Sequence, residues 1–173
     1  MRTAMAMVGM MILVWAFGAC AGQMNWDGMS PRRTEIAVYT STARFMIEHY
    51  RASGRTGEPA AFCLVVGRRE EVARGQQVRE SDRWDPGRQL LLNLSDLATP
   101  VVSISECEWN NNLEEIHRPT GRRAVVLGIS QPIWTREDFA TVRVSTRENR
   151  TYHGRWSCNV RLHVGEWQVL DCL

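Results

Sequence analysis

The fold is decided near the carboxyl end of the chain by residues 152–172, YHGRWSCNVRLHVGEWQVLDC. Apolar and polar side chains alternate through residues 152–164, which is the pattern of a strand buried on one face and solvated on the other. Gly165-Glu166 has the composition of a two-residue hairpin loop with glycine first. Residues 167–172 are therefore predicted to return as the partner strand.

Two further strands are predicted before this hairpin, over residues 124–134 and 139–146. Residues 31–50 carry apolar side chains at helical spacing, with a start signal at Ser30-Pro31 and a stop signal at Ser53-Gly54. A helical stripe and an apolar sheet face can bury each other. We therefore expect an α+β fold, in which an N-terminal helix packs on a curved antiparallel sheet that ends in a four-stranded meander.

The middle of the chain is predicted to hold shorter elements. Residues 60–66 form a continuous apolar run typical of a buried strand, and residues 101–105 indicate another strand. Residues 85–94 open with the helix-start pair Asp-Pro and continue with leucines, so a short helix is expected there. Residues 68–83 and 109–122 are polar and unpatterned, which favours loops.

The cysteines predict two disulfides. Cys20 lies in the segment that export would process, and four cysteines remain. An even set of cysteines in an exported chain indicates a disulfide framework, although spacing does not choose among the connectivities. We favour Cys63–Cys107 and Cys158–Cys172, because each pair then closes a compact region.

The hairpin bears on the second pair. A two-residue turn places Cys158 opposite Leu173, whereas a three-residue loop centred on Gly165 places it opposite Cys172. The three-residue loop also pairs Leu162 with a glutamine, which mismatches the apolar faces. A β-bulge would reconcile the two registers.

The first 21 residues have the order of a secretory signal peptide. Arg2 precedes an apolar run that is too short for a comfortable membrane span, and small residues follow it. Ala19-Cys20-Ala21 fits cleavage after the second alanine. Alternatively, Phe17-Gly18-Ala19-Cys20 resembles the lipobox of bacterial lipoproteins, which implies lipidation of Cys20 and attachment to a membrane by acyl chains.

These signals divide the chain into a signal peptide at residues 1–21, a tether at 22–30 and a single α+β domain at 31–173. The expected location is the periplasm, or the outer membrane through the lipid anchor of a bacterial cell.

The composition excludes several classes of function. A formal net charge of +2 over 173 residues gives no support to a nucleic-acid partner. All 21 basic residues are arginine, so neither a Schiff-base lysine nor a P-loop lysine is present. No metal-ligand spacing and no nucleotide-binding motif is found, so neither a metal site nor a cofactor is predicted.

The polar face of the long C-terminal strand supplies the candidate site. His153, Arg155, Arg161 and His163 alternate along that face, and Arg143 lies on the polar side of the preceding strand. Guanidinium groups bind carboxylates and phosphates through paired hydrogen bonds, so these five side chains predict binding of a small anionic ligand or an acidic protein. The alternative is the ordinary solvated face of a half-buried sheet.

The order of helix and sheet is similar to the cystatin/NTF2-like class of domains. The closing sequence Gly165-Glu166-Trp167-Gln168-Val169 resembles the final Gly-x-Trp-x-Val strand of many such domains. The resemblance implies a pocket between helix and sheet, which holds a His/Asp pair in the enzymes of the class and only binds ligands or partners in others. It carries over no catalytic residue to this chain.

The expected function is that of an exported, non-catalytic accessory domain of the cell envelope that binds a ligand or partner. The alternative is an NTF2-like hydrolase or isomerase with a titratable group in the pocket, and a third possibility is a structural envelope protein.

Overall fold

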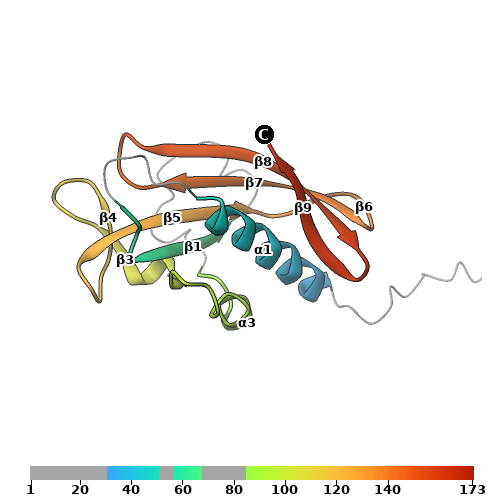
Figure 1. Cartoon of the computed structure of the whole chain (residues 1–173), viewed down its shortest axis with the longest axis horizontal. Helices are drawn as coiled ribbons and strands as arrows, with labels where there is room; N and C mark the ends of the chain where they lie inside the picture. The colour runs from blue at the N-terminus through green and yellow to red at the C-terminus, as the bar shows by residue number, and fades with distance from the viewer. Residues whose placement is uncertain (1–30, 51–56, 68–84) are drawn as a thin grey trace, which may run out of the picture.

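The computed structural model describes residues 31–50, 57–67 and 85–173. The predicted signal peptide, Cys20, the tether and the loop at 68–83 lie outside these ranges. One main helix lies against a strand-rich mixed sheet, so the chain is α+β as predicted (Figure 1).

Helix α1 (Pro31–Glu48) begins at the predicted proline and ends five residues before the predicted stop signal at Ser53. Its buried side chains form one stripe along the helix, made up of Val38, Tyr39, Thr42, Ala43 and Met46. Thr42 is also fully buried on this stripe, where its hydroxyl donates to the carbonyl of Val38 at 2.8 Å. This hydrogen bond satisfies the buried hydroxyl of Thr42.

The main path of the sheet runs β2-β1-β5-β7-β8-β9. Strand β1 pairs in parallel with both neighbours, and β5, β7, β8 and β9 pair with one another antiparallel. The prediction of an antiparallel sheet is therefore wrong at the β1 edge. Parallel neighbours need a long crossover, and the chain between β1 and β5 supplies one through helix α3 (Arg88–Leu92) and a small hairpin. The bounds of these strands are β1 (Ala61–Gly67), β2 (Val101–Ser103), β5 (Arg122–Ser130), β7 (Phe139–Arg147), β8 (His153–His163) and β9 (Glu166–Cys172).

The strand predicted over residues 124–134 is two strands. Strand β5 ends at Ser130, and β6 (Ile133–Arg136) begins after Gln131-Pro132. Proline lacks the N–H that a central strand needs, which explains the break. Both strands pair with β7: β5 pairs along the second half of β7, and β6 pairs along its first half. The four-stranded meander is therefore not confirmed as predicted.

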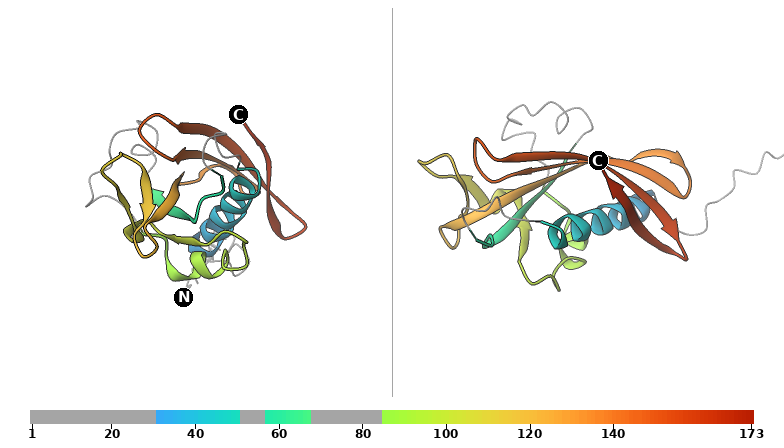
Figure 2. Two further views of the ribbon diagram at one scale, coloured as in Figure 1. Left: turned by 60° about the vertical axis from the view of Figure 1, so that its left-hand side comes forward. Right: turned by 45° about the horizontal axis from the view of Figure 1, so that its top comes forward.

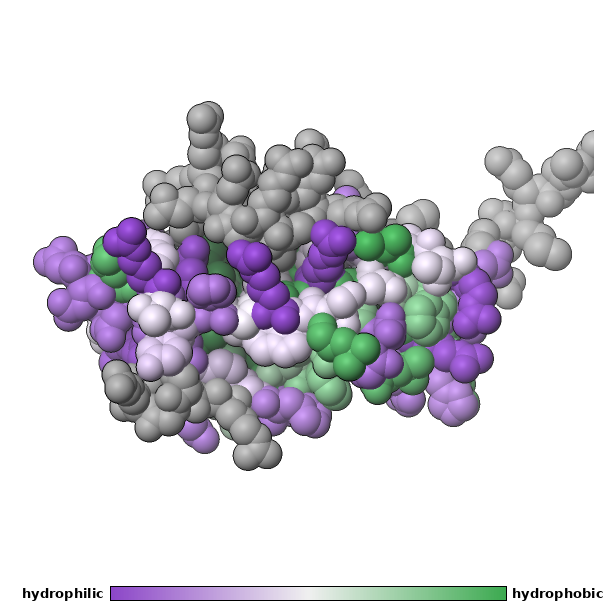
Figure 3. All heavy atoms as spheres, turned by 90° about the horizontal axis from the view of Figure 1, so that it is seen from above, coloured by the Kyte–Doolittle hydropathy of each residue, from purple (hydrophilic) through white to green (hydrophobic). Residues whose placement is uncertain are grey.

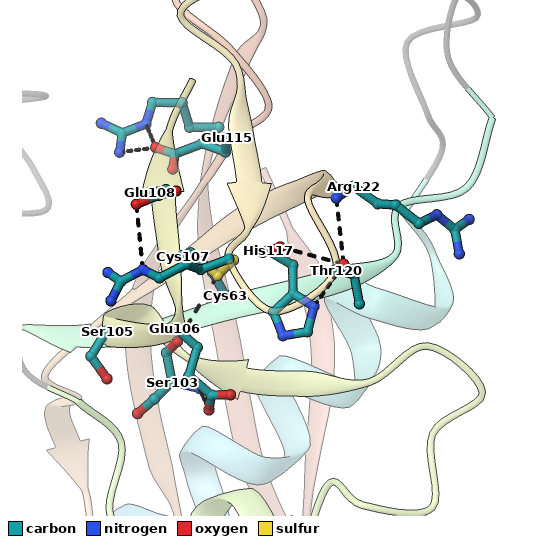
Figure 4. The surroundings of a disulfide bond; sticks show 12 residues. Cys63, Ser103, Ser105, Glu106, Cys107, Glu108, Glu115, His117, Thr120 and Arg122 are labelled. Atoms are coloured by element: carbon teal, nitrogen blue, oxygen red, sulfur yellow. Dashed lines mark hydrogen bonds and ion pairs between the residues drawn. A yellow bond between two sulfur atoms is a disulfide. The ribbon is translucent and has the colours of Figure 1, made fainter. Parts of the chain in front are cut away.

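The segment predicted as a loop at 109–122 contains part of a small hairpin. Strand β3 (Cys107–Trp109) pairs with β4 (Glu115–His117), and β4 pairs with β5. Strands of three residues are too short to show periodicity in the sequence. Their pairing depends on the neighbouring strand β5 and on the turn that joins β3 to β4. The predicted Cys63–Cys107 disulfide is present and joins this hairpin to β1 (Figure 4); we call it the β1–β3 disulfide.

Two other short elements differ from expectation in detail. The strand predicted to reach residue 105 stops at the end of β2, and the 3-10 helix η2 (Ile104–Glu106) follows it. Helix α3 (Arg88–Leu92) is present, but Gly87 is its N-cap. The carboxylate of Asp85, at the predicted start, instead accepts a hydrogen bond from the Ser105 backbone N–H at 3.0 Å.

The hairpin of β8 and β9 turns one residue earlier than predicted. The loop is Val164-Gly165, with φ of 48° and 83°, and His163 pairs with Glu166. Positive φ at both loop residues gives the twist that joins right-twisted strands. The register then shifts between Asn159 and Val160, and Cys158 lies opposite Cys172. The predicted Cys158–Cys172 bond is present, and we call it the β8–β9 disulfide.

The sheet curls around α1, so that the helix lies in its hollow (Figure 2). The main core fills the space between α1 and the inner face of β1, β5, β7 and β8. Trp167 of β9 closes this core and is only 8% exposed. A second, smaller core lies on the reverse face of β1 and β5 beneath η2, around the β1–β3 disulfide.

Candidate functional site

A cavity of about 440 Å³ lies between the carboxyl end of α1 and the adjoining ends of β7 and β8. Its lining is mostly apolar. Cys172, which belongs to the β8–β9 disulfide, forms part of the wall. Its volume lies within the range of small-molecule sites. The rings that line it are those of Phe45, His49, Tyr50, Tyr152, His153 and Trp156.

Gly154 shapes the β8 wall of the cavity. The six-membered ring of Trp156 lies over this glycine, where any Cβ would collide with it. The absence of a side chain at Gly154 therefore lets Trp156 lie flat along its own strand. The Trp156 ring thereby becomes part of the cavity wall.

A buried carboxylate ties the carboxyl end of α1 to the sheet beside the cavity. The Tyr50 hydroxyl donates to Glu148 Oε1 at 2.5 Å, and Arg123 Nη1 contacts Glu148 Oε2 at 3.1 Å. The Glu148 side chain is 9% exposed. Burial raises the pKa of Tyr50 well above its usual value, and the hydrogen bond to Glu148 and the charge of Glu148 raise it further.

These contacts engage both oxygens of Glu148, so its carboxylate is a structural support and not a free base. The histidines are placed differently. His49 stacks on Phe45 with ring centroids 4.2 Å apart, and its Nδ1 lies 2.8 Å from the Phe45 carbonyl oxygen, a donor position that leaves Nε2 for a ligand. His153 stands on the β8 side of the same cavity.

The predicted anion-binding side chains all lie on the outer face of β7 and β8 and are exposed. The cross-strand register brings three of them together, because Arg143, Arg155 and His153 belong to every second pair of the ladder and therefore share its outer face. Figure 3 shows hydrophilic side chains standing over these upper strands. His153, the first residue of β8, also reaches the cavity.

The other two predicted residues lie apart from this group. Arg161 is opposite Phe139, near the other end of β7, and its Nε lies 3.4 Å from Asp138 Oδ2. His163 pairs with Glu166 at the hairpin turn. The predicted five-residue site is therefore divided between two ends of one strand.

Sequence reasoning missed His49 and Glu148 as neighbours of a cavity. The spacing of Phe45 and His49 by four residues signals that their rings meet on one helix face. No local signal marks Glu148, because its partner Tyr50 is 98 residues away in the chain. His117 lies elsewhere, with its Nδ1 3.0 Å from the Thr120 hydroxyl (Figure 4).

The described residues contain no group of three or more His, Cys, Asp or Glu side chains that could hold a metal ion. No helix within the described ranges has the length and apolar character that a membrane-spanning segment needs. No family model, no curated protein and no solved structure matches this chain. The resemblance to cystatin/NTF2-like domains therefore stays a prediction.

Proposed function

We propose that this protein is an exported binding domain that holds a small ligand with a flat apolar body in the cavity at the end of α1. The observation that carries the proposal is a cavity of about 440 Å³ with aromatic rings on walls from two elements. Rings packed in stacked or edge-on arrangements contribute about 0.5–1.5 kcal/mol each beyond their buried area. His49 and His153 both line the cavity and are both exposed, so they are the side chains placed to meet a polar group at the open side of the ligand.

The two disulfides support the exported location that the proposal assumes. Two disulfides indicate an oxidising, non-cytoplasmic environment. Retention by a lipid on Cys20 is part of the proposal, and mass spectrometry of the mature protein tests it. We expect diacylglycerol on Cys20, whereas a mature chain that starts at Gly22 would show that the protein is released.

The cavity proposal is tested with a matched pair of histidine variants. His153 and His163 are both exposed on the outer face of β8, but only His153 lines the cavity. Ligands are sought by native mass spectrometry of protein isolated from its own compartment, and by thermal shift with a panel of aromatic acids and amines. We expect His153→Ala to weaken binding about 3- to 10-fold and His163→Ala to leave it unchanged.

Two outcomes would reject the proposal. One is a purified protein that carries no small molecule and responds to no member of the panel. The other is a ligand whose affinity falls equally in both histidine variants, since its site would then not be the cavity.

A second candidate is the hydrolase or isomerase that the fold resemblance implies. The observation that favours it is His49, an exposed residue that lines the cavity and whose Nδ1 is held by the Phe45 carbonyl oxygen, so that Nε2 is the ring atom left for acid–base work. An enzyme would return its ligand chemically altered, and His49→Gln would abolish turnover while binding remained. Recovery of the ligand unchanged after long incubation favours the binding domain.

A further inference from the structure

The outer face of β7 and β8 carries a pattern that the cavity does not use. Arg143 lies opposite Ser157, and Ser145 lies opposite Arg155, in pairs of one antiparallel ladder that are separated by the single inward-facing pair Val144 and Trp156. The four residues therefore form a square with arginines on one diagonal and serines on the other. We call Arg143, Ser145, Arg155 and Ser157 the Arg–Ser square.

The four positions share one face. Residues two apart on a strand point to the same side, and the intervening residues Val144 and Trp156 face the core. Directly opposite residues have Cβ atoms about 4.5–5.5 Å apart, and diagonal residues are about 7–8 Å apart, a separation that long side chains bridge. Both guanidinium groups thus reach the space above the square.

The two arginines differ in their partners from three other arginines of the sheet. Arg123, Arg147 and Arg161 each contact a carboxylate. Within the described ranges, no ion pair is found for Arg143 or Arg155.

The acidic side chain that lies nearest along β9 is already engaged. Asp171 lies opposite Asn159, the next outer-face position after Ser157, and accepts a hydrogen bond from Asn159 Nδ2 at 2.9 Å. Arg147, the next outer-face residue of β7 after Ser145, is also engaged. Its Nη2 atom lies 2.5 Å from Glu115 Oε1, and its guanidinium group lies over the Trp109 ring. The Arg–Ser square is therefore a local excess of positive charge with no carboxylate assigned to it among these neighbours.

We propose that the Arg–Ser square binds the phosphate group of a small phosphate ester. Each guanidinium can present two parallel N–H donors to an oxyanion, and each serine adds a hydroxyl donor. Together they offer about six donors, which exceeds the roughly four lone-pair positions of a carboxylate and suits the three terminal oxygens of a phosphate ester. The donor set selects phosphate over carboxylate.

Occupancy relieves an unfavourable arrangement in the free protein. Two like charges on adjacent cross-strand positions repel each other, and an anion between them removes that repulsion. The site is exposed, so its affinity falls with ionic strength. The Arg–Ser square lies on the outer face of the sheet, whereas the main core lies on the inner face. The phosphate proposal therefore does not depend on the cavity proposal.

The test is calorimetric titration of the full mature protein with inorganic phosphate and glycerol phosphate at fixed ionic strength, with acetate as the carboxylate control. We expect Arg143→Ala and Arg155→Ala each to weaken phosphate binding about 10- to 100-fold, since each removes hydrogen bonds to a charged group. Ser145→Ala and Ser157→Ala are expected to weaken it about 2- to 10-fold. Arg161→Ala is the matched control, because it removes an exposed arginine of β8 outside the square, and it should change binding less than twofold.

Arg155→Lys separates geometry from charge. It keeps the positive charge but loses the planar fork, so a built site predicts a loss close to that of Arg155→Ala. Equal binding of acetate and phosphate, an unchanged affinity in Arg155→Lys, or an equal loss in Arg161→Ala would each overturn the proposal. Binding to phosphatidylglycerol vesicles without binding to glycerol phosphate would also overturn it. Urea unfolding of each variant confirms that the exposed substitutions leave the fold intact.

Discussion

Replacing Tyr50 by phenylalanine removes one hydroxyl and leaves the rest of the contact between α1 and the sheet. The ring of Tyr50 still meets Phe62 edge-on at a centroid distance of 5.2 Å, so packing is retained. What is lost is the hydrogen bond to Glu148 Oε1. Hydrogen bonds to charged groups contribute about 1.5–3 kcal/mol, so Tyr50→Phe should lower the free energy of unfolding by about that amount.

Urea unfolding at neutral pH measures this loss as a shift in midpoint at constant slope. Tyr152→Phe is the control, because Tyr152 is 37% exposed and no hydrogen bond of its hydroxyl is found within the described ranges. That control should change stability by no more than about 0.5 kcal/mol. A double-mutant cycle with Glu148→Gln should give a coupling of about 0.5–3 kcal/mol.

The pH dependence checks the same contact independently. The pKa of Tyr50 is raised above 10.0 in the folded state, so its stabilising contribution is fully present below that pH. Above pH 10 the unfolded chain loses the proton first, and the free energy of unfolding falls as pH rises. Tyr39 has a raised pKa as well, by burial and by the charge of Glu35, so the alkaline loss in Tyr50→Phe should be shallower but not absent. The contact would be refuted by two results together. The losses of unfolding free energy in Tyr50→Phe and Glu148→Gln would add up in the double variant, and Tyr50→Phe would lose stability above pH 10 as steeply as the parent protein.

The other predictions concern stability at separate places in the fold. In the chain-entropy treatment, the β1–β3 disulfide closes 44 residues and the β8–β9 disulfide closes 14, so replacing each cysteine pair by alanine should cost about 4 and about 3 kcal/mol by urea unfolding. Gly154→Ala should cost about 1–3 kcal/mol in the same assay, because the new Cβ displaces the Trp156 ring. Val164→Asn should raise the thermal midpoint, because the β-branched valine holds a φ of 48° in a loop that favours asparagine before glycine. The hydrogen bond from Arg44 lowers the pKa of Asp96 below 3.8, so this stabilisation is present above that pH and is lost as pH falls through the lowered value. An acid titration of Asp96→Asn should therefore show a shallower loss of stability than the parent protein.

Much of the fold was accessible from local patterns. The helical stripe predicted α1, the apolar run predicted β1, and the alternation predicted β7 and β8. The predicted disulfide pairs were both confirmed, and a bulge reconciles the register of the second pair as foreseen. These successes share one cause, since periodicity records which face of an element is buried.

Sequence reasoning failed where partners are distant. The parallel pairing of β1 with β5 and the hairpin of β3 and β4 depend on how the chain returns to the sheet. The candidate site shows the same limit. The exposed arginines were identified, but alternation along a strand could not tell that Arg161 meets Asp138 while Arg143 and Arg155 flank two serines.

The amino-acid sequence by itself determined the longer elements, their buried faces and the number of cysteines available for crosslinks, because these follow from the order of neighbouring residues. The tertiary structure alone decided the cavity, the contact of Tyr50 with Glu148 and the grouping of the Arg–Ser square. Each of these requires residues from separate segments to meet at one place. Only the register of the sheet and the packing of α1 against it specify that meeting.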